Sequence, residues 1–394
     1  MRVGVVVRYV NASFRDPASC FIMDEMLELV RLGVDVHALR LAPGSPRIVW
    51  GFTLHSTTPL DVIGGLARSV VWWRSTGPLP LVESIYAHEI VRRVERCGID
   101  ILHAHFAYPA GYAASLAKRV SGKPLVVTVH GYDVLVNKRR SYGVRLKKGF
   151  EHVVRSALLA ADRVVVNSKC LYNAVNGIAP LGEKTVLIPQ GVDLSIFKPR
   201  RAGWLRRKLG VRDDEVAIFT LKEHNRICGV EYLIVAFKHL IDRGVRGARL
   251  LIGGTGPLTR LYVELAYRLG LRELVKFTGR IPRIRVPWYM SAIDIYVQPS
   301  LLEGFGLALT EAMACAKPVV ASRVGGLLDQ VVDGFNGILV EPGNSESIAD
   351  ALQYLLENPS ERVRMGFNAR RVVEERFSLR ERAVRILKLY RELA

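Results

Sequence analysis

Short apolar runs alternate along this chain with segments whose apolar residues recur at helical spacing. The continuous run Val3 to Val7 is typical of a strand in a parallel sheet that is covered on both faces. A helix is predicted next, because the apolar residues between Phe21 and Leu32 share one side and Gly33 ends the pattern. A second strand follows from Val34 to Leu41. This strand, helix and strand predict the opening of an α/β domain.

The alternation continues to the end of the chain. Residues 101–129 read as strand, helix and strand, with Gly122 at the turn, and a strand is predicted over 185–188. A second series is predicted with strands at 216–220, 249–252, 275–278 and 294–298, helices at 230–241 and up to 269, and two last helices at 360–377 and 379–393. At 394 residues, two domains are the natural expectation. Pro189, Gly191 and the basic stretch up to Lys208 mark the boundary between them.

One stretch of the second series combines a strand, a glycine-bearing loop and a helix. Pro299 stops the strand, Gly304 and Gly306 follow, and apolar residues then recur at helical spacing. The first turn of a helix has unpaired N–H groups and partial positive charge, so a diphosphate would fit there. Glu303 and Glu311 flank this loop and suit hydroxyl groups of one extended ligand. Spacing alone also fits an ordinary α/β domain with two solvated glutamates.

Composition narrows the class of protein. The content of 49% hydrophobic and 24% charged residues is typical of a soluble globular chain. No run reaches the roughly 18 apolar residues of a membrane helix, and the apolar start is too short for a signal peptide, so we expect a cytoplasmic protein. The five cysteines are isolated and lack C-x-x-C spacing, so neither a disulfide framework nor a zinc site is suggested.

The formal net charge is +19, and the excess of Lys and Arg over Asp and Glu is +9 in residues 1–195 and +10 in residues 196–394. A basic surface could face nucleic acid, an anionic membrane or anionic ligands, or be a solvated thermophile-type exterior. Zinc-finger, helix-turn-helix and aromatic RNP patterns are missing from the sequence, so nucleic acid is the least favoured partner.

The block QPSLLEGFGLALTEAMACAKPVVAS resembles the E-x7-E signature of retaining GT-B glycosyltransferases, in glycosyltransferase family 4 and glycosyl transferases group 1. The resemblance implies two Rossmann-like domains facing across a cleft, with the C-terminal helix crossing back to the first. We therefore expect an acceptor-binding domain over 1–192 plus 379–394 and a donor-binding domain over 193–378. It also implies that Glu303 contacts the donor sugar and Glu311 the ribose. The backbone of Gly304, Phe305, Gly306 and Leu307 would meet the phosphates.

Other segments carry the same resemblance. VTVHGYD is similar to an element whose histidine lies against the donor sugar, which implies a catalytic role for His130 beside Glu303. A lone histidine is otherwise more often structural. His105 and Asp133 are candidates on the acceptor side, and Arg280 and Ile281 belong to the segment that packs against the nucleotide base. Many members have a Gly-Gly loop near the donor phosphates where this chain has residues 11–13, Asn-Ala-Ser.

The diphosphate site departs from the family pattern. Lys222 stands at the usual strand-end position of one cation, but Cys228 stands where a second, Lys, is common. Arg226 is the available substitute, because a guanidinium fork grips phosphate in a bidentate manner.

Two segments have open interpretations. The apolar patch within 50–85, which includes Trp72 and Trp73, could dock into an acceptor cleft or a headgroup layer, although a helix packed on its own domain is favoured. The basic run 138–148 and the apolar positions after it suit a lipid-linked or anionic acceptor at a membrane surface, or equally a solvated loop and helix.

The function expected from the resemblance is retaining transfer of a hexosyl group from a UDP- or GDP-sugar to an acceptor hydroxyl, without a catalytic metal or cofactor. The partners would be the nucleotide sugar, a glycan or lipid-linked acceptor, and an anionic membrane surface if the protein is peripheral on the inner face. Two alternatives stay open: a phosphorylase or nucleotide-sugar epimerase on the same fold, and a catalytically idle sugar-nucleotide-binding protein.

Overall fold

A computed structural model describes residues 1–8, 20–43, 47–49, 51–57 and 81–394. The chain forms two compact units, Met1–Pro189 with Leu379–Ala394, and Gln190–Ser378. The expected boundary after residue 192 lies three residues later than this division. The difference arises because the Val192 N–H donates to the Phe377 carbonyl at 2.9 Å and its side chain is buried in the core of the second unit.

The first unit is built on a sheet whose described strands run in the order β3-β4-β2-β1-β5-β6-β7-β8. Every neighbouring pair is parallel except β3 with β4, so the expectation of a mainly parallel sheet is confirmed. The strands are β1 Arg2–Val7, β2 Asp35–Pro43, β3 Arg47–Val49, β4 Phe52–Thr57, β5 Ile101–His105, β6 Leu125–Thr128, β7 Arg163–Val166 and β8 Thr185–Leu187.

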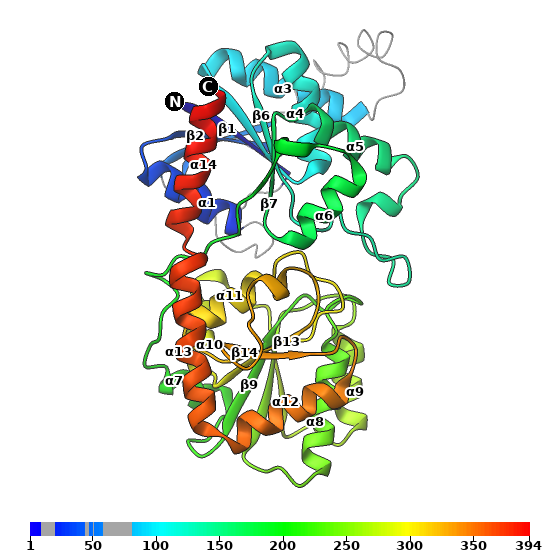
Figure 1. The fold of residues 1–394 in the computed structure, drawn as a ribbon, viewed down its shortest axis with the longest axis vertical. Coiled ribbons are helices and arrows are strands. Elements are labelled where there is room, and N and C mark those ends of the chain that lie inside the picture. Colours follow the sequence, from blue (N-terminus) through cyan, green and yellow to red (C-terminus); the bar gives the residue numbers. More distant parts are fainter. Residues whose placement is uncertain (9–19, 44–46, 50, 58–80) are drawn as a thin grey trace. The chain divides into compact units, whose positions relative to one another are not determined.

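Helices connect these strands and cover the sheet (Figure 1). They are α1 Cys20–Arg31, α3 Leu81–Cys97, α4 Tyr112–Ser121, α5 Phe150–Ala160, α6 Lys169–Ile178 and α14 Leu379–Leu393. Gly122 ends α4 with a left-handed conformation, as its place in the sequence predicts. The last helix, α14, packs against α1 and buries Ile386 and Tyr390 in the core of this unit, so the predicted return of the C-terminal helix is confirmed.

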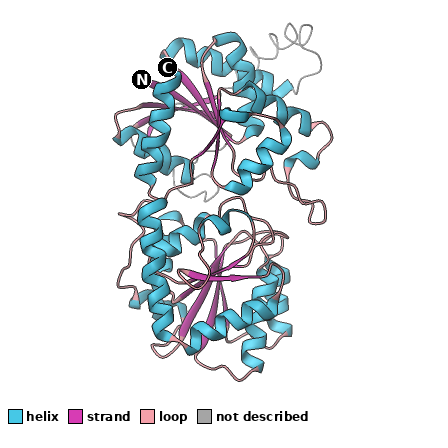
Figure 2. Cartoon of the chain, viewed as in Figure 1, coloured by secondary structure: helices cyan, strands magenta, loops and turns pink. Residues whose placement is uncertain are grey.

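The second unit has an all-parallel sheet whose described strands run in the order β11-β10-β9-β12-β13-β14 (Figure 2). Its strands are β9 Val216–Leu221, β10 Ala248–Gly253, β11 Val275–Gly279, β12 Ile295–Gln298, β13 Val319–Ser322 and β14 Gly337–Val340. Its helices are α7 Gly203–Leu209, α8 Val230–Asp242, α9 Thr259–Arg268, α10 Val286–Ala292, α11 Leu307–Ala314, α12 Ser345–Glu357 and α13 Pro359–Arg376. The chain order reverses between β9 and β12, and ligands of open α/β sheets bind at such a switch point.

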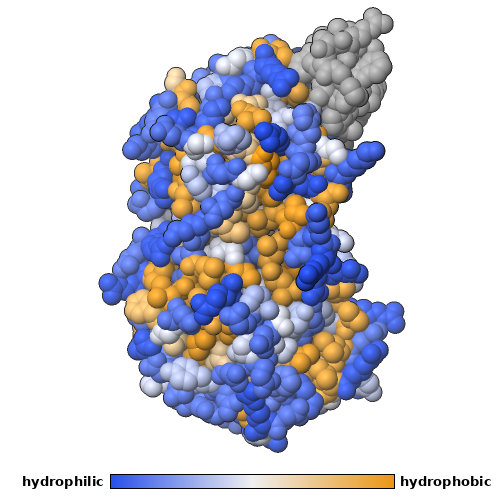
Figure 3. All heavy atoms as spheres, turned by 45° about the vertical axis from the view of Figure 1, so that its right-hand side comes forward, coloured by the Kyte–Doolittle hydropathy of each residue, from blue (hydrophilic) through white to orange (hydrophobic). Residues whose placement is uncertain are grey.

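The surface of the protein is mixed in polarity. Hydrophilic residues cover much of the face drawn in Figure 3, with apolar patches among them. Among the described residues, no helix is both long enough and apolar enough to cross a membrane.

The apolar patch around Trp72 and Trp73, and the 11–13 segment, lie outside the described residues. The apolar side of α5 is buried at Val154, Ala157 and Leu158, which favours a helix packed on its own unit over a membrane-facing one.

Candidate active site

The switch point of the second unit brings together two residues that lie far apart in the sequence. Strand β9 pairs with β12, Lys222 directly follows β9, and Glu303 lies in the loop after β12. The Lys222 Nζ is 2.6 Å from the Glu303 Oε2, and both side chains are largely buried. The loop glutamate is therefore held by an ion pair.

Three donors converge on one oxygen of Glu303. Its Oε2 accepts from Lys222, from Gln298 Nε2 at 2.7 Å and from Ser300 Oγ at 2.9 Å. Burial alone would raise the pKa of Glu303, but Lys222 and these hydrogen bonds outweigh it and lower the pKa. Burial likewise opposes the charge of Lys222, and Glu303 outweighs it and raises the pKa of the lysine. Among the described residues, none donates to the other oxygen, Oε1.

The loop turns into helix α11 at a position that requires glycine. Gly306 has φ of 95°, and a Cβ there would lie 2.5 Å from the Leu327 Cδ2. No described side chain caps the start of α11. Its first N–H groups are thus free of side-chain caps, as an anion site at a helix start requires.

Glu311 lies in α11 and is buried against a cation that the sequence did not indicate. Arg283 Nη1 pairs with the Glu311 Oε1, and the Arg283 guanidinium lies 4.7 Å from the ring centroid of Phe197. Only 3% of Glu311 is exposed. Arg283 comes two residues after Ile281, the end of the predicted base segment, and has no local pattern that marks it. The role of Glu311 at the ribose stays a prediction, with Arg283 orienting its carboxylate.

Cys228 occupies the position of the missing cation. Its thiol is 5% exposed, and burial raises its pKa to about 11, so it is neutral at pH 7. The next residue, Gly229, has φ of 67°, and a Cβ there would meet the Pro299 carbonyl oxygen at 2.0 Å. This close approach sets the Cys228 turn against the loop of Glu303. The Arg226 side chain is exposed and makes no recorded hydrogen bond or ion pair within the described residues.

The structure limits how three predicted donor contacts can work. Ile281 and Phe305 are 4% and 6% exposed and belong to the core of the second unit, so the predicted donor contacts of these two residues would be made by their backbone. Leu307 packs partly against the same core. Arg280 is exposed.

In the first unit, His130 follows strand β6 and lies in a cluster of aromatic rings. Its Nε2 is 3.1 Å from the His105 Nδ1, and its ring centroid is 4.8 Å from that of Phe21 and 4.6 Å from that of Phe106. Burial, together with nearby His105, lowers the pKa of His130 well below its usual value. The imidazole is therefore neutral, and each of its ring nitrogens lies within hydrogen-bond distance of a neighbouring side chain, Nε2 of His105 and Nδ1 of Asn167.

The two acceptor-side candidates are placed differently from the expectation. His105 is 1% exposed, with Nδ1 on His130 and Nε2 3.7 Å from Glu25. Asp133 is fully buried, and its carboxylate accepts from the backbone N–H groups of Ala107, His130 and Gly131. Neither side chain is open to an acceptor. Both position the backbone and ring of His130 instead.

A buried network behind His130 was also missed from the sequence. Arg382 of α14 is 2% exposed, and its Nε donates to the Glu25 Oε2 at 2.5 Å. Its Nη1 donates to the Ile188 carbonyl at 2.6 Å and to the Asn167 Oδ1 at 3.2 Å. The Asn167 Nδ2 in turn lies 3.4 Å from the His130 Nδ1. The C-terminal helix thus supports the histidine cluster.

Family comparisons agree with this architecture. The model described as Glycosyltransferase Family 4 matches residues 21–196, and the model described as Glycosyl transferases group 1 matches residues 204–372. The chain is a family 4, group 1 glycosyltransferase. N-acetyl-alpha-D-glucosaminyl L-malate synthase of Bacillus anthracis is 27% identical to it over 300 residues, 76% of each chain. D-inositol 3-phosphate glycosyltransferase of Kribbella flavida is 32% identical over 283 residues, 68% of this chain and 65% of the other.

Solved structures show the same fold as this glycosyltransferase. Sucrose-phosphate synthase from Thermosynechococcus elongatus matches with a TM-score of 0.83 and 21% identity, over 100% of this chain and 98% of the other. Anabaena HepE, in complex with UDP and glucose, matches with a TM-score of 0.80 and 22% identity over the whole of both chains. At these identities the likeness establishes the GT-B fold alone.

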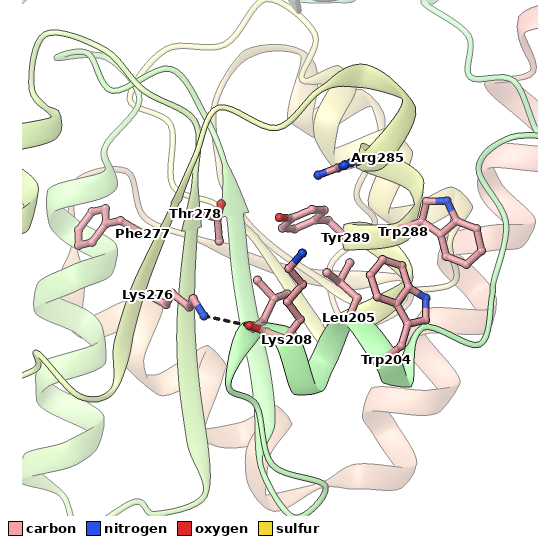
Figure 4. A pocket seen from close by; sticks show the side chains of 10 residues that line it. Trp204, Leu205, Lys208, Lys276, Phe277, Thr278, Arg285, Trp288 and Tyr289 are labelled. Carbon is pink, nitrogen blue, oxygen red and sulfur yellow. Dashed lines mark hydrogen bonds between the residues drawn. The ribbon is translucent and has the colours of Figure 1, made fainter.

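A hollow of the glycosyltransferase lies beside the edge strand β11 (Figure 4). It has a volume of about 330 Å³, and Trp204 of α7 and Trp288 of α10 line it with their ring centroids 6.1 Å apart. Lys276 Nζ donates to the Lys208 carbonyl at 3.1 Å on its wall. None of the predicted donor residues lines this hollow, so it is separate from the loop of Glu303.

Proposed function

We propose that this glycosyltransferase transfers a hexosyl group from a UDP- or GDP-sugar to an acceptor hydroxyl with retention of anomeric configuration. The observation that carries the proposal is the arrangement around Glu303. Three donors hold one carboxylate oxygen, and the other has no recorded donor among the described residues. An ionised carboxylate fixed in this way is suited to accept a hydrogen bond from a sugar hydroxyl.

The diphosphate would bind between Lys222 and the start of α11. As the bond to the sugar breaks, negative charge builds on the departing diphosphate. The Lys222 ammonium and the N–H groups after Gly306 would stabilise that charge, because their positions are fixed before the reaction. Arg226, at the exposed edge of the Cys228 turn, would supply the second cation. The solved complex of HepE with UDP and glucose supports this ligand class for the fold.

The sugar carries partial positive charge in the transition state. The ionised Glu303 would stabilise it, and the neutral His130 would contact the sugar and its leaving group from the first unit. His105 and Asp133 would hold His130 in place. No metal enters this scheme, because the lysine and the helix start supply the positive charge.

We further propose that the acceptor is anionic. The names of two relatives contain L-malate and inositol 3-phosphate, both negatively charged, and this chain carries a formal charge of +19. The exposed cations Lys138, Arg139, Lys147 and Lys148 suit such an acceptor, free or lipid-linked. Arg145 is already paired with Glu151 at 2.6 Å.

The test combines calorimetry with UDP, GDP and their sugars and a transfer assay that follows the released nucleotide. Glu303→Gln is expected to lower turnover roughly 100-fold or more while leaving affinity for the free nucleotide nearly unchanged. Glu341→Gln, an exposed glutamate in the same unit, is the matched control and should behave as wild type. NMR of the product would give the anomeric configuration.

Other outcomes point to the alternatives. Binding without turnover, across donors and anionic acceptors, would indicate a catalytically idle binding protein. An isomerised nucleotide sugar would indicate an epimerase, and a strict need for inorganic phosphate a phosphorylase. Equal loss of free-nucleotide affinity in Glu303→Gln and Glu311→Ala would contradict the separate roles given to these carboxylates.

A further inference from the structure

Three atoms of types that bind metal ions lie close together in the first unit, on residues that have no role in the proposed transfer reaction. His37 Nδ1 is 3.0 Å from His55 Nε2, and that nitrogen is 3.9 Å from Cys97 Sγ. All three atoms lie within 4.8 Å of one another. Two imidazoles and a thiol are a ligand set that zinc favours.

The tertiary structure brings these residues together. Strands β2 and β4 are parallel neighbours, with His37 opposite Thr53 and Leu39 opposite His55. Because side chains two positions apart share a face of a sheet, His37 and His55 lie diagonally on one face. Cys97 is the last residue of α3. The ligands come from two strands and a helix end, so no C-x-x-C or H-x-x-H spacing marks them in the sequence.

The separations fit a tetrahedral ion. With Zn–N near 2.0–2.1 Å and Zn–S near 2.3 Å, two nitrogens should lie roughly 3.3 Å apart and nitrogen and sulfur roughly 3.6 Å apart. The observed 3.0 and 3.9 Å differ by only a few tenths of an ångström. A hydrogen bond between the two rings would explain the short distance between His37 and His55, but it would not explain why the Cys97 thiol lies beside them.

The outer ring nitrogens of the two histidines have different surroundings: that of His37 faces a carboxylate, and that of His55 has no recorded partner among the described residues. The free ring nitrogen of a ligating histidine usually faces a carboxylate or carbonyl. His37 Nε2 lies 3.4 Å from Asp35 Oδ1, and the Arg2 Nε holds Asp35 at 3.3 Å. His55 Nδ1 is buried without a hydrogen-bond partner among the described residues.

We propose that His37, His55 and Cys97 bind one zinc-class divalent ion through Nδ1, Nε2 and Sγ, with water at the fourth position. Both imidazoles coordinate as neutral rings, and Cys97 binds as the thiolate, so one proton passes to solvent for each ion bound. The ion joins β2, β4 and the end of α3. It has no part in the transfer reaction, which the second unit's Lys222 and Glu303 serve.

A second described cluster, Glu25 with His103 and His105, is excluded by its own hydrogen bonds. His103 Nδ1 is 2.6 Å from the Tyr390 hydroxyl and its Nε2 is 2.7 Å from the Thr128 hydroxyl. Both ring nitrogens are therefore engaged by protein hydroxyl groups, one as donor and the other as acceptor.

The first experiment titrates the untagged, chelator-treated full chain with Co²⁺ and then with Zn²⁺. We expect one equivalent to bind, with the visible bands of tetrahedral cobalt and a thiolate charge-transfer band, both removed by Zn²⁺. Cys97→Ser should abolish the charge-transfer band, and His55→Ala should weaken binding by more than about 100-fold, since even supporting partners cost 10–100-fold. His152→Ala, which removes an exposed histidine, is the control and should bind as wild type.

The second experiment needs no variant and so is independent of folding defects. Cys97 and Cys170 are both partly exposed, whereas Cys20, Cys228 and Cys315 are buried. Zn²⁺ should slow alkylation of Cys97 at least tenfold, followed by peptide mass spectrometry, and leave Cys170 unchanged. Equal labelling of Cys97 with and without Zn²⁺, or a thiolate charge-transfer band that survives in Cys97→Ser, would overturn the proposal.

Discussion

The buried pair between Arg382 and Glu25 gives the sharpest prediction about stability. Arg382→Ala removes a guanidinium that is 2% exposed and leaves the Glu25 carboxylate, 1% exposed, beside the neutral rings of His103 and His105, with the His105 Nε2 at 3.7 Å. The Ile188 carbonyl also loses its 2.6 Å donor. Removing one partner of a buried pair costs about 3–5 kcal/mol, because the remaining charge stays buried and unpaired.

A matched control lies on the same helix. Arg380 is 68% exposed and its Nη1 is 3.6 Å from the Glu28 Oε1. The Glu28 carboxylate keeps its 2.8 Å pair with Arg31, and an ion pair made by an exposed side chain contributes about 0–1 kcal/mol, so Arg380→Ala should change stability little. The double variant Glu25→Met with Arg382→Met removes both charges and should recover most of the loss, because hydrophobic replacement of a buried pair is often neutral.

Hydrogen exchange with mass spectrometry is the suitable assay, because it reports each unit separately. In Arg382→Ala, amides of α14, α1 and β5 should exchange faster, while those of β9 to β14 should be unchanged. The melting temperature of the first unit should fall by roughly 6–20 °C, at about 2–4 °C for each kcal/mol. The reasoning would be refuted if Arg382→Ala lost no more stability than Arg380→Ala, or if the double variant were less stable than the single one.

Three further predictions concern the second unit and the basic loop. Glu311→Ala should raise the dissociation constant for free nucleotide roughly 10–100-fold in calorimetry. Arg283→Gln should also raise this constant, since Arg283 orients the Glu311 carboxylate. Wild-type affinity in either variant would contradict the assignment of Glu311 to the ribose. The lowered pKa of Glu303 means that its ion pair with Lys222 stabilises the fold above the unfolded pKa of about 4.3 and is lost as pH falls through the lowered value. Melting curves between pH 3 and 6 should therefore show a weaker acid dependence in Glu303→Gln, and parallel profiles would contradict this. If the 138–148 loop meets anionic lipid, sedimentation with anionic vesicles should decrease as salt rises, whereas salt-independent binding would exclude an electrostatic contact.

The sequence was sufficient to predict the elements that carry the candidate site. Apolar runs and helical spacing predict parallel strands and connecting helices, since burial of apolar faces depends on periods of two and 3.6 residues. Gly306 and the two glutamates of the loop are local features as well. The return of the last helix to the first unit came from the family resemblance and is confirmed.

Only the tertiary structure decided which side chains meet. Lys222 and Glu303 are 81 residues apart, Arg283 and Glu311 are 28 apart, and Glu25 and Arg382 are 357 apart. Each of these charges is largely or fully buried, and a charge removed from water requires a partner that no local pattern specifies. For the same reason, His105 and Asp133, which resemble acceptor contacts in the sequence, prove to be buried supports of His130. Sequence periodicity determined which segments form strands and helices. The pairing of charges across distant elements determined which side chains are held in place at the candidate site.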